Sequence, residues 1–473
     1  MRQPTSLSAS LTRRQALALF GASAASLVAA CSGSGSPQAS SPAAPAPTGQ
    51  AQTPAQNQTQ TQGQTPAQAQ APAQAAQPVT LRWFFWTGSE EEVKFWTDLA
   101  AQASAALKPI SITFETDTFA NFWVKLPTQV ASGTVADLIG LQSLRCPTFA
   151  SRNVYLPLDD LISADKDVNL PDFSKVIVDG LSYKSKLYAL AYDFGPYVTF
   201  YNKNLFQKAG VPVPKDDWTV DDFVSTAHAM TRTIDGAQVY GYAAPNNWDQ
   251  IVSWLYSAGT DFADPDFKQS WLSKPETQTV IQFYADLLNK EKVAAPITDP
   301  SNANWNREQF YAGRVAMYHD GPWNFVNLRS KMRDDWDITF FPRGQAGSVP
   351  WVAGSGFGIA ASTQHKTEAW QALKWLTSSD SLQQVAKAGR GYPGRQSAQP
   401  AFVHKDVPPQ HQELIAEQAK TAKPYRVNTN WQEIVTQLGR DLVDPIMLTG
   451  KPVPEAIKDA EPAYQDLISK AAS

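Results

Sequence analysis

The fifteen tryptophans of this 473-residue sequence all lie between Trp83 and Trp431, and several stand beside turn-forming residues. The tryptophans that border glycine, proline or asparagine are Trp86, Trp248, Trp323 and Trp351. A flat ring held at a turn can stack on the apolar C–H face of a sugar, while amide, carboxylate, hydroxyl and guanidinium groups bind the hydroxyls. The pattern therefore indicates a carbohydrate-binding surface. Trp370 and Trp375, by contrast, have helical spacing and are expected in the core.

Hydrolysis of a carbohydrate is the competing chemistry, because paired carboxylates can act as acid and base. Adjacent acids occur at 159–160, 216–217, 221–222 and 334–335. Neighbouring side chains point apart, however, and these pairs stand at loops and helix starts. The sequence has no Gly-x-Ser-x-Gly elbow, and its five histidines are dispersed without partners at ligand spacing. We expect no catalytic residue, no cofactor and no metal, with a carbohydrate-active enzyme as the less favoured alternative.

The elements that must position these residues alternate between strands and helices. Residues 79–86, 110–117 and 136–142 have strand composition, and helical patterns follow the first two. Ser89 and Glu92 form a capping box at the first helix. This β-α-β-α-β order predicts a mainly parallel sheet with helices on its faces. Ligands of such sheets bind beyond the carboxyl ends of the strands, which here carry Trp86-Thr87, Asp117-Thr118 and Gln142-Ser143. Helix capping is an equal interpretation for Thr118.

The first 77 residues predict an exported, anchored protein. Residues 1–31 combine a basic start, an apolar run and a lipobox that ends at Cys31, and Arg13-Arg14 resemble a twin-arginine export signal. Residues 32–77 are almost wholly Ser, Gly, Pro, Ala, Gln and Thr, which predicts a disordered tether. We expect a protein lipid-anchored through Cys31 at the extracytoplasmic face of the cell membrane. An ordinary cleaved signal with a chance cysteine is the alternative.

The remaining residues, 78–473, contain one cysteine, Cys146, so core burial rather than an internal disulfide must stabilise them. The formal net charge is −4, and no basic stripe is interleaved with aromatic residues. These features exclude a nucleic-acid partner. No later apolar segment approaches the length of a membrane span. We expect a soluble monomeric body.

Residues 183–223, YKSKLYALAYDFGPYVTFYNKNLFQKAGVPVPKDDWTVDDF, resemble a segment of family 1 solute-binding proteins of ATP-binding-cassette importers, the maltose and multi-sugar binders. The matching positions are Tyr188-Ala189-Leu190, Tyr201-Asn202-Lys203, Leu205-Phe206, Ala209-Gly210 and Trp218-Thr219. Further matches are Phe310, Gly313, Ala316-Met317, Gly321-Pro322-Trp323, and the stretches GSGFGIAAS and GYPGRQSA. The chain departs from the family pattern at Ser185-Lys186, Ala191 and Ala136-Asp137. These departures leave the identity of the ligand open.

The resemblance implies an α/β, type II periplasmic-binding-protein-like fold, with two lobes and a ligand cleft between them. Carried over, the first lobe would span 78–195 plus 355–423, and the second 196–354 plus 424–473. Hinges are expected near Gly195 and near Gly354-Ser355-Gly356, because closure needs residues that absorb backbone rotation. A plain turn is the alternative for the second set of glycines.

The resemblance also implies an extracytoplasmic sugar-binding subunit that delivers a mono- or oligosaccharide to an importer's permease subunits. The expected aromatic platforms are Trp86 from the first lobe and Trp248, Trp323 and Trp431 from the second, and Trp351 is a further expected ligand contact. The expected polar contacts are Thr87, Gln142, Ser143, Arg145, Asp193, Asn247, Ser355 and Arg395. For Arg145 and Arg395, an ion pair with a neighbouring acid is the alternative. The alternative is that the same fold binds a polyol, a peptide or a phosphate ester instead of a sugar.

Overall fold

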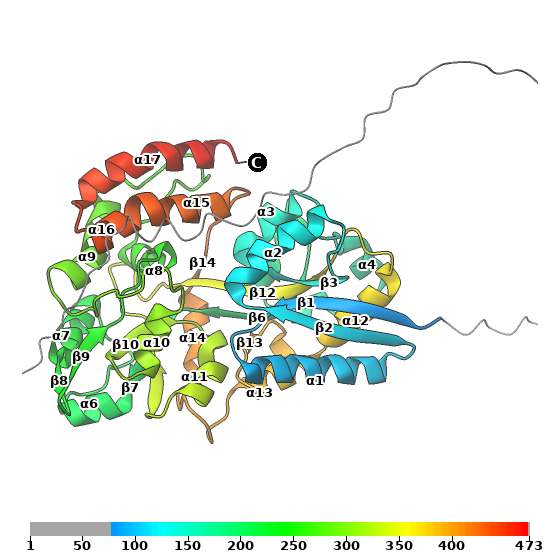
Figure 1. Cartoon of the computed structure of the whole chain (residues 1–473), viewed down its shortest axis with the longest axis horizontal. Coiled ribbons are helices and arrows are strands. Elements are labelled where there is room, and N and C mark those ends of the chain that lie inside the picture. Colours follow the sequence, from blue (N-terminus) through cyan, green and yellow to red (C-terminus); the bar gives the residue numbers. More distant parts are fainter. Residues whose placement is uncertain (1–76, 472–473) are drawn as a thin grey trace, which may run out of the picture. The chain divides into compact units, whose positions relative to one another are not determined.

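The computed structural model describes residues 77–471 (Figure 1). The predicted signal with Cys31, and the predicted tether up to residue 76, lie outside the described residues. Within residues 77–471, no helix is long and apolar enough to cross a bilayer. This part of the chain contains a seven-stranded and a five-stranded sheet, together with a two-stranded hairpin, β4 (Ser182–Tyr183) and β5 (Lys186–Leu187). We call each of the two larger sheets, with the helices packed on it, a lobe.

Lobe 1 contains the seven-stranded sheet in the order β13-β6-β12-β3-β1-β2, with β14 beside β12. Its strands are β1 (Val79–Trp86), β2 (Ile110–Asp117), β3 (Leu138–Gln142), β6 (Leu190–Pro196), β12 (Trp351–Ile359), β13 (Tyr392–Pro393) and β14 (Lys423–Pro424). β1 is parallel to both β2 and β3, which confirms the predicted parallel unit. β12 is antiparallel to β3 and β6.

Helices cover both faces of the lobe 1 sheet, with α1 below and α2 above it in Figure 1. The helices of this lobe are α1 (Glu90–Ala106), α2 (Phe119–Ala131), α3 (Cys146–Ala150), α4 (Asp159–Ala164), α5 (Lys175–Gly180), α12 (Lys366–Leu376) and α13 (Ser379–Lys387). Thr118 caps α2, since its side chain accepts a hydrogen bond from the Asn121 amide. Only half of the predicted capping box forms at α1. The Ser89 hydroxyl accepts from the Glu92 amide at 3.3 Å, but the Glu92 carboxylate turns inward to other partners described below.

Lobe 2 contains the five-stranded sheet in the order β11-β7-β10-β9-β8. Its strands are β7 (Val198–Asn202), β8 (Arg232–Ile234), β9 (Ala237–Tyr242), β10 (Val315–Asp320) and β11 (Trp336–Thr339). Its helices are α6 (Lys203–Ala209), α7 (Val220–Met230), α8 (Trp248–Ala258), α9 (Pro275–Asn289), α10 (Trp305–Tyr311), α11 (Phe325–Lys331), α15 (Trp431–Leu438), α16 (Asp444–Leu448) and α17 (Val453–Ser469). β7 is antiparallel to both of its neighbours.

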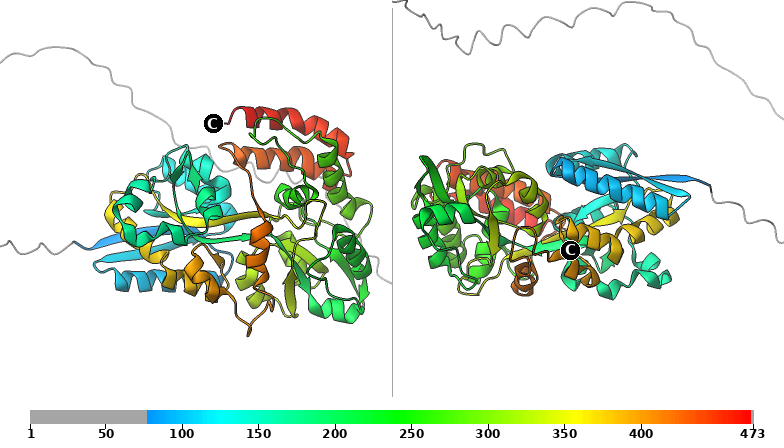
Figure 2. Two further views of the ribbon diagram at one scale, coloured as in Figure 1. Left: turned by 180° about the vertical axis from the view of Figure 1, so that it is seen from behind. Right: turned by 90° about the horizontal axis from the view of Figure 1, so that it is seen from below.

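The chain passes between the two sheets three times. β6 leads into β7 through Tyr197, the return lies between β11 and β12, and the last passage follows β14. Two of these connections, along β6 and β12, can be followed in Figure 1 and, from behind and below, in Figure 2. Helix α14 (Leu414–Thr421) precedes the last passage and hydrogen-bonds lobe 2, because Gln418 accepts from the Phe341 amide at 2.8 Å.

The glycines predicted at the second hinge lie inside paired strand β12 rather than in a turn. A Cβ atom at Gly354 would lie 2.3 Å from the Asp193 carbonyl oxygen, and one at Gly356 would lie 2.5 Å from that of Leu190. The close approach of β6 therefore accounts for both glycines. Their role in rotation stays a prediction.

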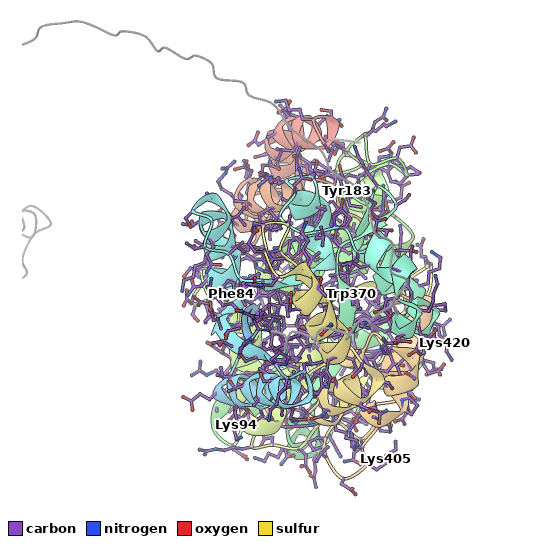
Figure 3. All side chains as sticks on the ribbon, turned by 90° about the vertical axis from the view of Figure 1, so that its right-hand side faces the viewer. Phe84, Lys94, Tyr183, Trp370, Lys405 and Lys420 are labelled. Atoms are coloured by element: carbon purple, nitrogen blue, oxygen red, sulfur yellow. The ribbon has the colours of Figure 1, made fainter. Side chains whose placement is uncertain are left out.

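Aromatic side chains dominate the core of lobe 1. Trp83, Phe85 and Trp96 pack edge-on around Phe357, at ring-centroid distances of 4.9 to 5.7 Å. The predicted core residue Trp370 is buried on α12 (Figure 3), and Trp375 is partly buried against the same core. Lys94, Lys405 and Lys420 lie at the surface in the same view. Cys146 is a buried free thiol, so the described part of the chain is held by packing rather than by a disulfide.

Candidate functional site

The Gly-Pro-Trp turn places Trp323 at the junction of the two lobes. Trp323 lies in a 3₁₀ turn, η5 (Pro322–Asn324), between β10 and α11. A Cβ atom at Gly321 would lie 2.2 Å from the Trp323 ring, and one at Gly195 would lie 2.4 Å from Cγ of Pro322. The ring therefore folds back over Gly321, and strand β6 packs directly on the turn. Both approaches require glycine, which gives this sequence pattern a steric reason.

An ion pair between partly buried Arg307 and buried Asp320 fixes the plane of the Trp323 ring. The Trp323 Nε1–H donates to Oδ1 of Asp320 at 2.8 Å, and the Gly321 amide donates to the same oxygen at 2.9 Å. Arg307 on α10 donates to both carboxylate oxygens of Asp320, at 2.6 and 3.1 Å. Burial alone would lower the pKa of Arg307, but the charge and hydrogen bond of Asp320 raise it instead. Because the indole N–H is engaged, half-buried Trp323 can offer a ligand only its apolar face.

Further aromatic rings stand behind Trp323. Trp351 lies nearly parallel to it, with centroids 6.0 Å apart and an interplanar angle of 16°. Tyr197 packs on Trp351 at 4.1 Å, Tyr425 does so at 5.3 Å, and Trp431 packs on Tyr425 at 4.8 Å. Trp351 is 4% exposed and Trp431 is 2% exposed. These two predicted ligand contacts therefore support the Trp323 ring from behind rather than present a free face.

At the start of α8, the predicted residues are structural and the next residue faces the junction. Asn247 is the N-cap, accepting from the Asp249 amide at 2.8 Å, and Trp248 is buried against Phe262. Asp249 is partly exposed, and its Oδ1 accepts from the Tyr425 hydroxyl at 2.7 Å. Burial raises the pKa of Asp249, while Tyr425 and the charge of Arg145 oppose that shift. An acid in a first helical turn reads in sequence as a dipole partner, so no local signal marked Asp249.

The carboxyl end of β1 is covered by helix α2. Trp86 is 6% exposed and packs edge-on against Phe119 at 5.4 Å and Phe122 at 5.0 Å. Thr87 is buried, and its hydroxyl is 3.0 Å from that of Thr116. Trp86 therefore has little free ring face, whereas Phe119, which the sequence analysis did not single out, is exposed.

Arg145 follows β3 and reaches from lobe 1 to lobe 2. It lies in a 3₁₀ turn, η2 (Ser143–Arg145), and donates to the amide oxygen of Gln142 and, at 3.1 Å, to that of Gln432 on α15. Its guanidinium stands over Phe119, 5.1 Å from the centroid, and over the Trp123 ring at 4.7 Å. Burial lowers the pKa of Arg145 to about 10, and the charge of Asp249 opposes this shift. The hydrogen-bond partners of this guanidinium are thus amides, not carboxylates.

Ser143, Ser355 and Asp193 tie three strands of the lobe 1 sheet together. The Gly354 amide donates to the Ser143 hydroxyl at 3.2 Å, and the Ser355 amide donates to Oδ1 of Asp193 at 2.9 Å. Oδ2 of Asp193 lies 3.7 Å from the Arg390 guanidinium. All three predicted residues are buried. They shape the sheet end that faces the junction.

Glu92 joins this buried cluster to lobe 2. Its Oε2 lies 2.8 Å from Nε of Arg390, and its Oε1 accepts from the side-chain amide of Asn327 on α11 at 3.1 Å. Burial raises the pKa of Asp193 to about 7, although Arg390 opposes the shift. The cluster therefore contains two carboxylates and one guanidinium.

Arg395 lies inside lobe 1, away from these residues. Its guanidinium donates to the Thr377 and Val168 carbonyl oxygens at 2.5 and 2.8 Å, and to Asp172 at 3.1 Å. The ion pair that the sequence analysis gave as the alternative is therefore present. All three partners of the Arg395 guanidinium are residues of lobe 1. We therefore do not include Arg395 among the proposed ligand contacts.

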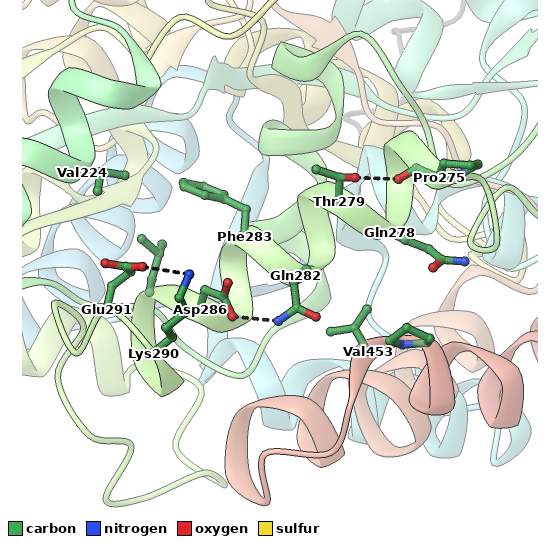
Figure 4. Close-up of a pocket in the computed structure, with 12 residues that line it drawn as sticks. Val224, Pro275, Gln278, Thr279, Gln282, Phe283, Asp286, Lys290, Glu291 and Val453 are labelled. Carbon is green, nitrogen blue, oxygen red and sulfur yellow. Dashed lines mark hydrogen bonds and ion pairs between the residues drawn. The ribbon is translucent and has the colours of Figure 1, made fainter.

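A hollow of about 670 Å³ lies elsewhere on lobe 2 (Figure 4). It is lined mainly by α9, with Val224 of α7 and Val453-Pro454 of α17. None of the predicted site residues lines it. Within residues 77–471, no group of three or more His, Cys, Asp or Glu side chains could hold a metal ion.

Comparison with known proteins relates this geometry to one family. Residues 87–383, more than half of the chain, match the family described as bacterial extracellular solute-binding protein. A mannitol-binding protein of Pseudomonas aeruginosa is 25% identical over 265 residues, which is 54% of this chain and 59% of that protein. The chain thus matches less than two thirds of the length of this relative.

Solved structures share the fold over most of their length. An ABC substrate-binding protein of Listeria monocytogenes in complex with cycloalternan has a TM-score of 0.76 and 21% identity, covering 82% of this chain and 99% of that one. An ABC transporter solute-binding protein of Agrobacterium vitis with bound D-mannitol has a TM-score of 0.69 and 22% identity, covering 84% and 100%. At these identities the likeness shows the two-lobed α/β fold.

Proposed function

Because the chain belongs to the bacterial extracellular solute-binding proteins, we propose that it captures a sugar or sugar alcohol between its two lobes for an ABC importer. The family and the neighbouring structures are binding proteins rather than enzymes. The proposed activity is therefore reversible binding on the extracytoplasmic side, followed by delivery to the importer's transmembrane subunits.

The geometry of Trp323 is the observation that carries this proposal. Its indole N–H is taken by Asp320, and Asp320 is held by Arg307, so the ring offers an apolar face in a fixed plane. Such a face suits the C–H side of a polyhydroxylated ring or chain. Asp249, Gln142 and Arg145 supply the nearby groups that can exchange hydrogen bonds with hydroxyls.

The other predicted residues have supporting roles in this proposal. Those that pack among the aromatic rings behind Trp323 or at the strand ends are Trp86, Thr87, Ser143, Asp193, Trp248, Trp351, Ser355 and Trp431. Asn247 acts through α8, which it caps and which begins just before Asp249.

An anionic ligand such as a phosphate ester fits this junction less well. The two guanidinium groups near Trp323 and Asp249 are those of Arg307 and Arg145. Arg307 is neutralised by Asp320, and Arg145 is hydrogen-bonded to two amide oxygens. Asp249 would also repel an anion. A neutral polyhydroxylated compound needs no such uncompensated cation.

The lobes would move relative to one another around the three chain passages. The proposed lobe boundaries are those that the sequence predicts, 78–195 plus 355–423 and 196–354 plus 424–473, so the second boundary falls within strand β12, which begins in the lobe 1 sheet at Trp351. A ligand that contacts both lobes stabilises the closed arrangement by its differential affinity for the two states. Anchoring through Cys31 would hold the protein beside its importer.

Binding of the full chain to mannitol, ribitol, tagatose, maltose and mannobiose tests this function, by thermal shift and then by calorimetry. At 100 times its Kd, a ligand adds about 2.7 kcal/mol of stability. We expect Trp323→Ala to weaken binding of the responding compound at least tenfold, which is about 1.4 kcal/mol.

Trp271→Ala is the matched control, because Trp271 is also partly exposed but its ring contacts Lys274 rather than Trp323 or Asp249 among the described interactions. It should leave the affinity unchanged. Stabilisation by peptides or phosphate esters alone would contradict the assignment of a sugar or polyol.

A further inference from the structure

Phe119 is an aromatic ring that the fold leaves in solvent. It is 39% exposed, and no other phenylalanine, tyrosine or tryptophan among residues 77–471 is as exposed. Phe122 and Trp123, on the same helix, are buried and supply the packing of α2 against the sheet. Phe119 is thus not needed to fill the core, and its exposure leaves apolar area in water that a ligand could cover.

The surroundings of Phe119 hold its ring in place. The ring meets the Trp86 ring at 89°, with centroids 5.4 Å apart, and the Arg145 guanidinium stands 5.1 Å from its centroid. Phe119 begins α2 directly beyond the carboxyl end of β2, beside the ends of β1 and β3. It therefore occupies the sheet edge at which α/β proteins bind ligands.

Two separate sets of contacts lie between Phe119 and Trp323. On the lobe 1 side, Arg145 stands over the Phe119 ring and donates to Gln432 on α15. The Trp351 Nε1–H donates to the Asp249 carbonyl oxygen at 2.8 Å, and Trp351 stacks on Trp323. Phe119 and half-buried Trp323 therefore belong to different lobes, and no contact joins their rings among the described residues.

We infer that Phe119 is the stacking face of lobe 1, with Arg145 as its polar neighbour, and that it forms an outer subsite for a second sugar unit. This inference rests on the proposed function and narrows its ligand to compounds of at least two sugar rings. Trp323 binds one ring and Phe119 binds another, because the two aromatic rings lie on different lobes and are not in contact. Trp86 lies underneath and supports Phe119 instead of touching the ligand.

Calorimetry with two-ring and single-unit compounds tests the outer subsite in the full chain. Maltose and mannobiose are compared with mannitol and tagatose, for the unchanged chain and for Phe119→Ala. We expect a two-ring compound to bind at least tenfold more tightly than either single-unit compound. Phe119→Ala should remove most of this advantage, about fivefold to tenfold, and change single-unit binding less than twofold. Phe119→Trp, which keeps a flat ring, should restore it.

Val124→Ala is the control, because Val124 is 73% exposed on the same helix and no contact joins it to Arg145 or Trp86 among the described interactions. It should behave as the unchanged chain does. The outer subsite is overturned if Phe119→Ala leaves the ratio unchanged, if Val124→Ala lowers it equally, or if single-unit compounds bind more tightly. Binding of none of the four compounds would instead overturn the proposed function, and the subsite with it.

Discussion

Asp193 is predicted from the sequence as a ligand contact, but in the structure it is buried and contacts protein groups instead. Both of its oxygens face protein groups, the Ser355 amide on one side and Arg390 on the other. Arg390 also serves Glu92, so two buried carboxylates share one guanidinium. Desolvation of an incompletely paired carboxylate raises the pKa of Asp193 to about 7, from a usual value of 3.8. Its role is therefore electrostatic and internal to lobe 1.

This shift predicts a pH dependence of stability. Above about pH 4 the unfolded chain releases the Asp193 proton, whereas the folded chain retains it up to about pH 7. The stabilising contribution is full below the unfolded pKa and is lost as the pH rises through the folded pKa. Asp193→Asn keeps an oxygen for the Ser355 amide but cannot ionise. Thermal unfolding from pH 4 to 8 should show the unchanged chain losing stability relative to this variant up to about pH 7. A constant difference across that range would contradict the assignment.

At the scale of elements, residues at the start of α15 form a contact between lobe 2 and lobe 1. The Thr148 hydroxyl on α3 donates to the Thr429 carbonyl oxygen at 3.0 Å in a buried position. Arg145 donates to Gln432, and exposed Arg152 lies 3.4 Å from Glu433. An exposed ion pair contributes about 0–1 kcal/mol, whereas loss of a buried hydrogen bond costs about 1 kcal/mol or more. The Thr148 hydrogen bond should therefore contribute more to the free energy of unfolding than the Arg152 ion pair does.

Substitution at these two positions checks the ranking. Thr148→Val keeps the shape of the side chain but removes its donor, and we expect the free energy of unfolding to fall by about 1 kcal/mol. Arg152→Ala should lower it by less than about 0.5 kcal/mol, since solvent screens that pair. Urea denaturation of both variants measures these changes. A larger loss for Arg152→Ala than for Thr148→Val would show that the ion pair carries the contact.

At the scale of the whole described body, two sheets are joined by connections that are short at β6–β7 and longer elsewhere. The proposed ligand contacts are divided between them, with Phe119 and Arg145 on lobe 1 and Trp323 and Asp249 on lobe 2. A ligand that touches both groups can shift the population of a closed arrangement, but only by its differential affinity for that state.

Solution scattering tests this coupling. We expect the radius of gyration of the full chain to fall when the compound identified by calorimetry is added to saturation. Trp323→Ala should require at least tenfold more of that compound for the same change, because the lobe 2 contact is lost. An unchanged radius at saturation would mean that binding and lobe closure are not linked in this protein.

Short stretches of sequence were enough to predict the elements around the site. The strands at 79–86 and 110–117, the helices after them and the parallel pairing of β1 with β2 and β3 follow from local periodicity and from the β-α-β order. The Gly-Pro-Trp turn and the family resemblance could also be recognised from the sequence, because each depends on residues that are close together in the chain. The export signal, the tether and the lobe boundaries stay predictions.

Only the tertiary structure decided which of these side chains are free. Trp86 and Trp351 stand at turns in sequence, yet α2 and Tyr197 cover them, while Phe119 is left exposed. Glu92 reads locally as a capping residue, but it binds Asn327, 235 residues later in the chain. Local sequence determines backbone conformation through steric and capping preferences that act within a few residues. Exposure, ion pairing and pKa depend instead on groups that only folding brings together, so they are fixed by the packing of the two lobes.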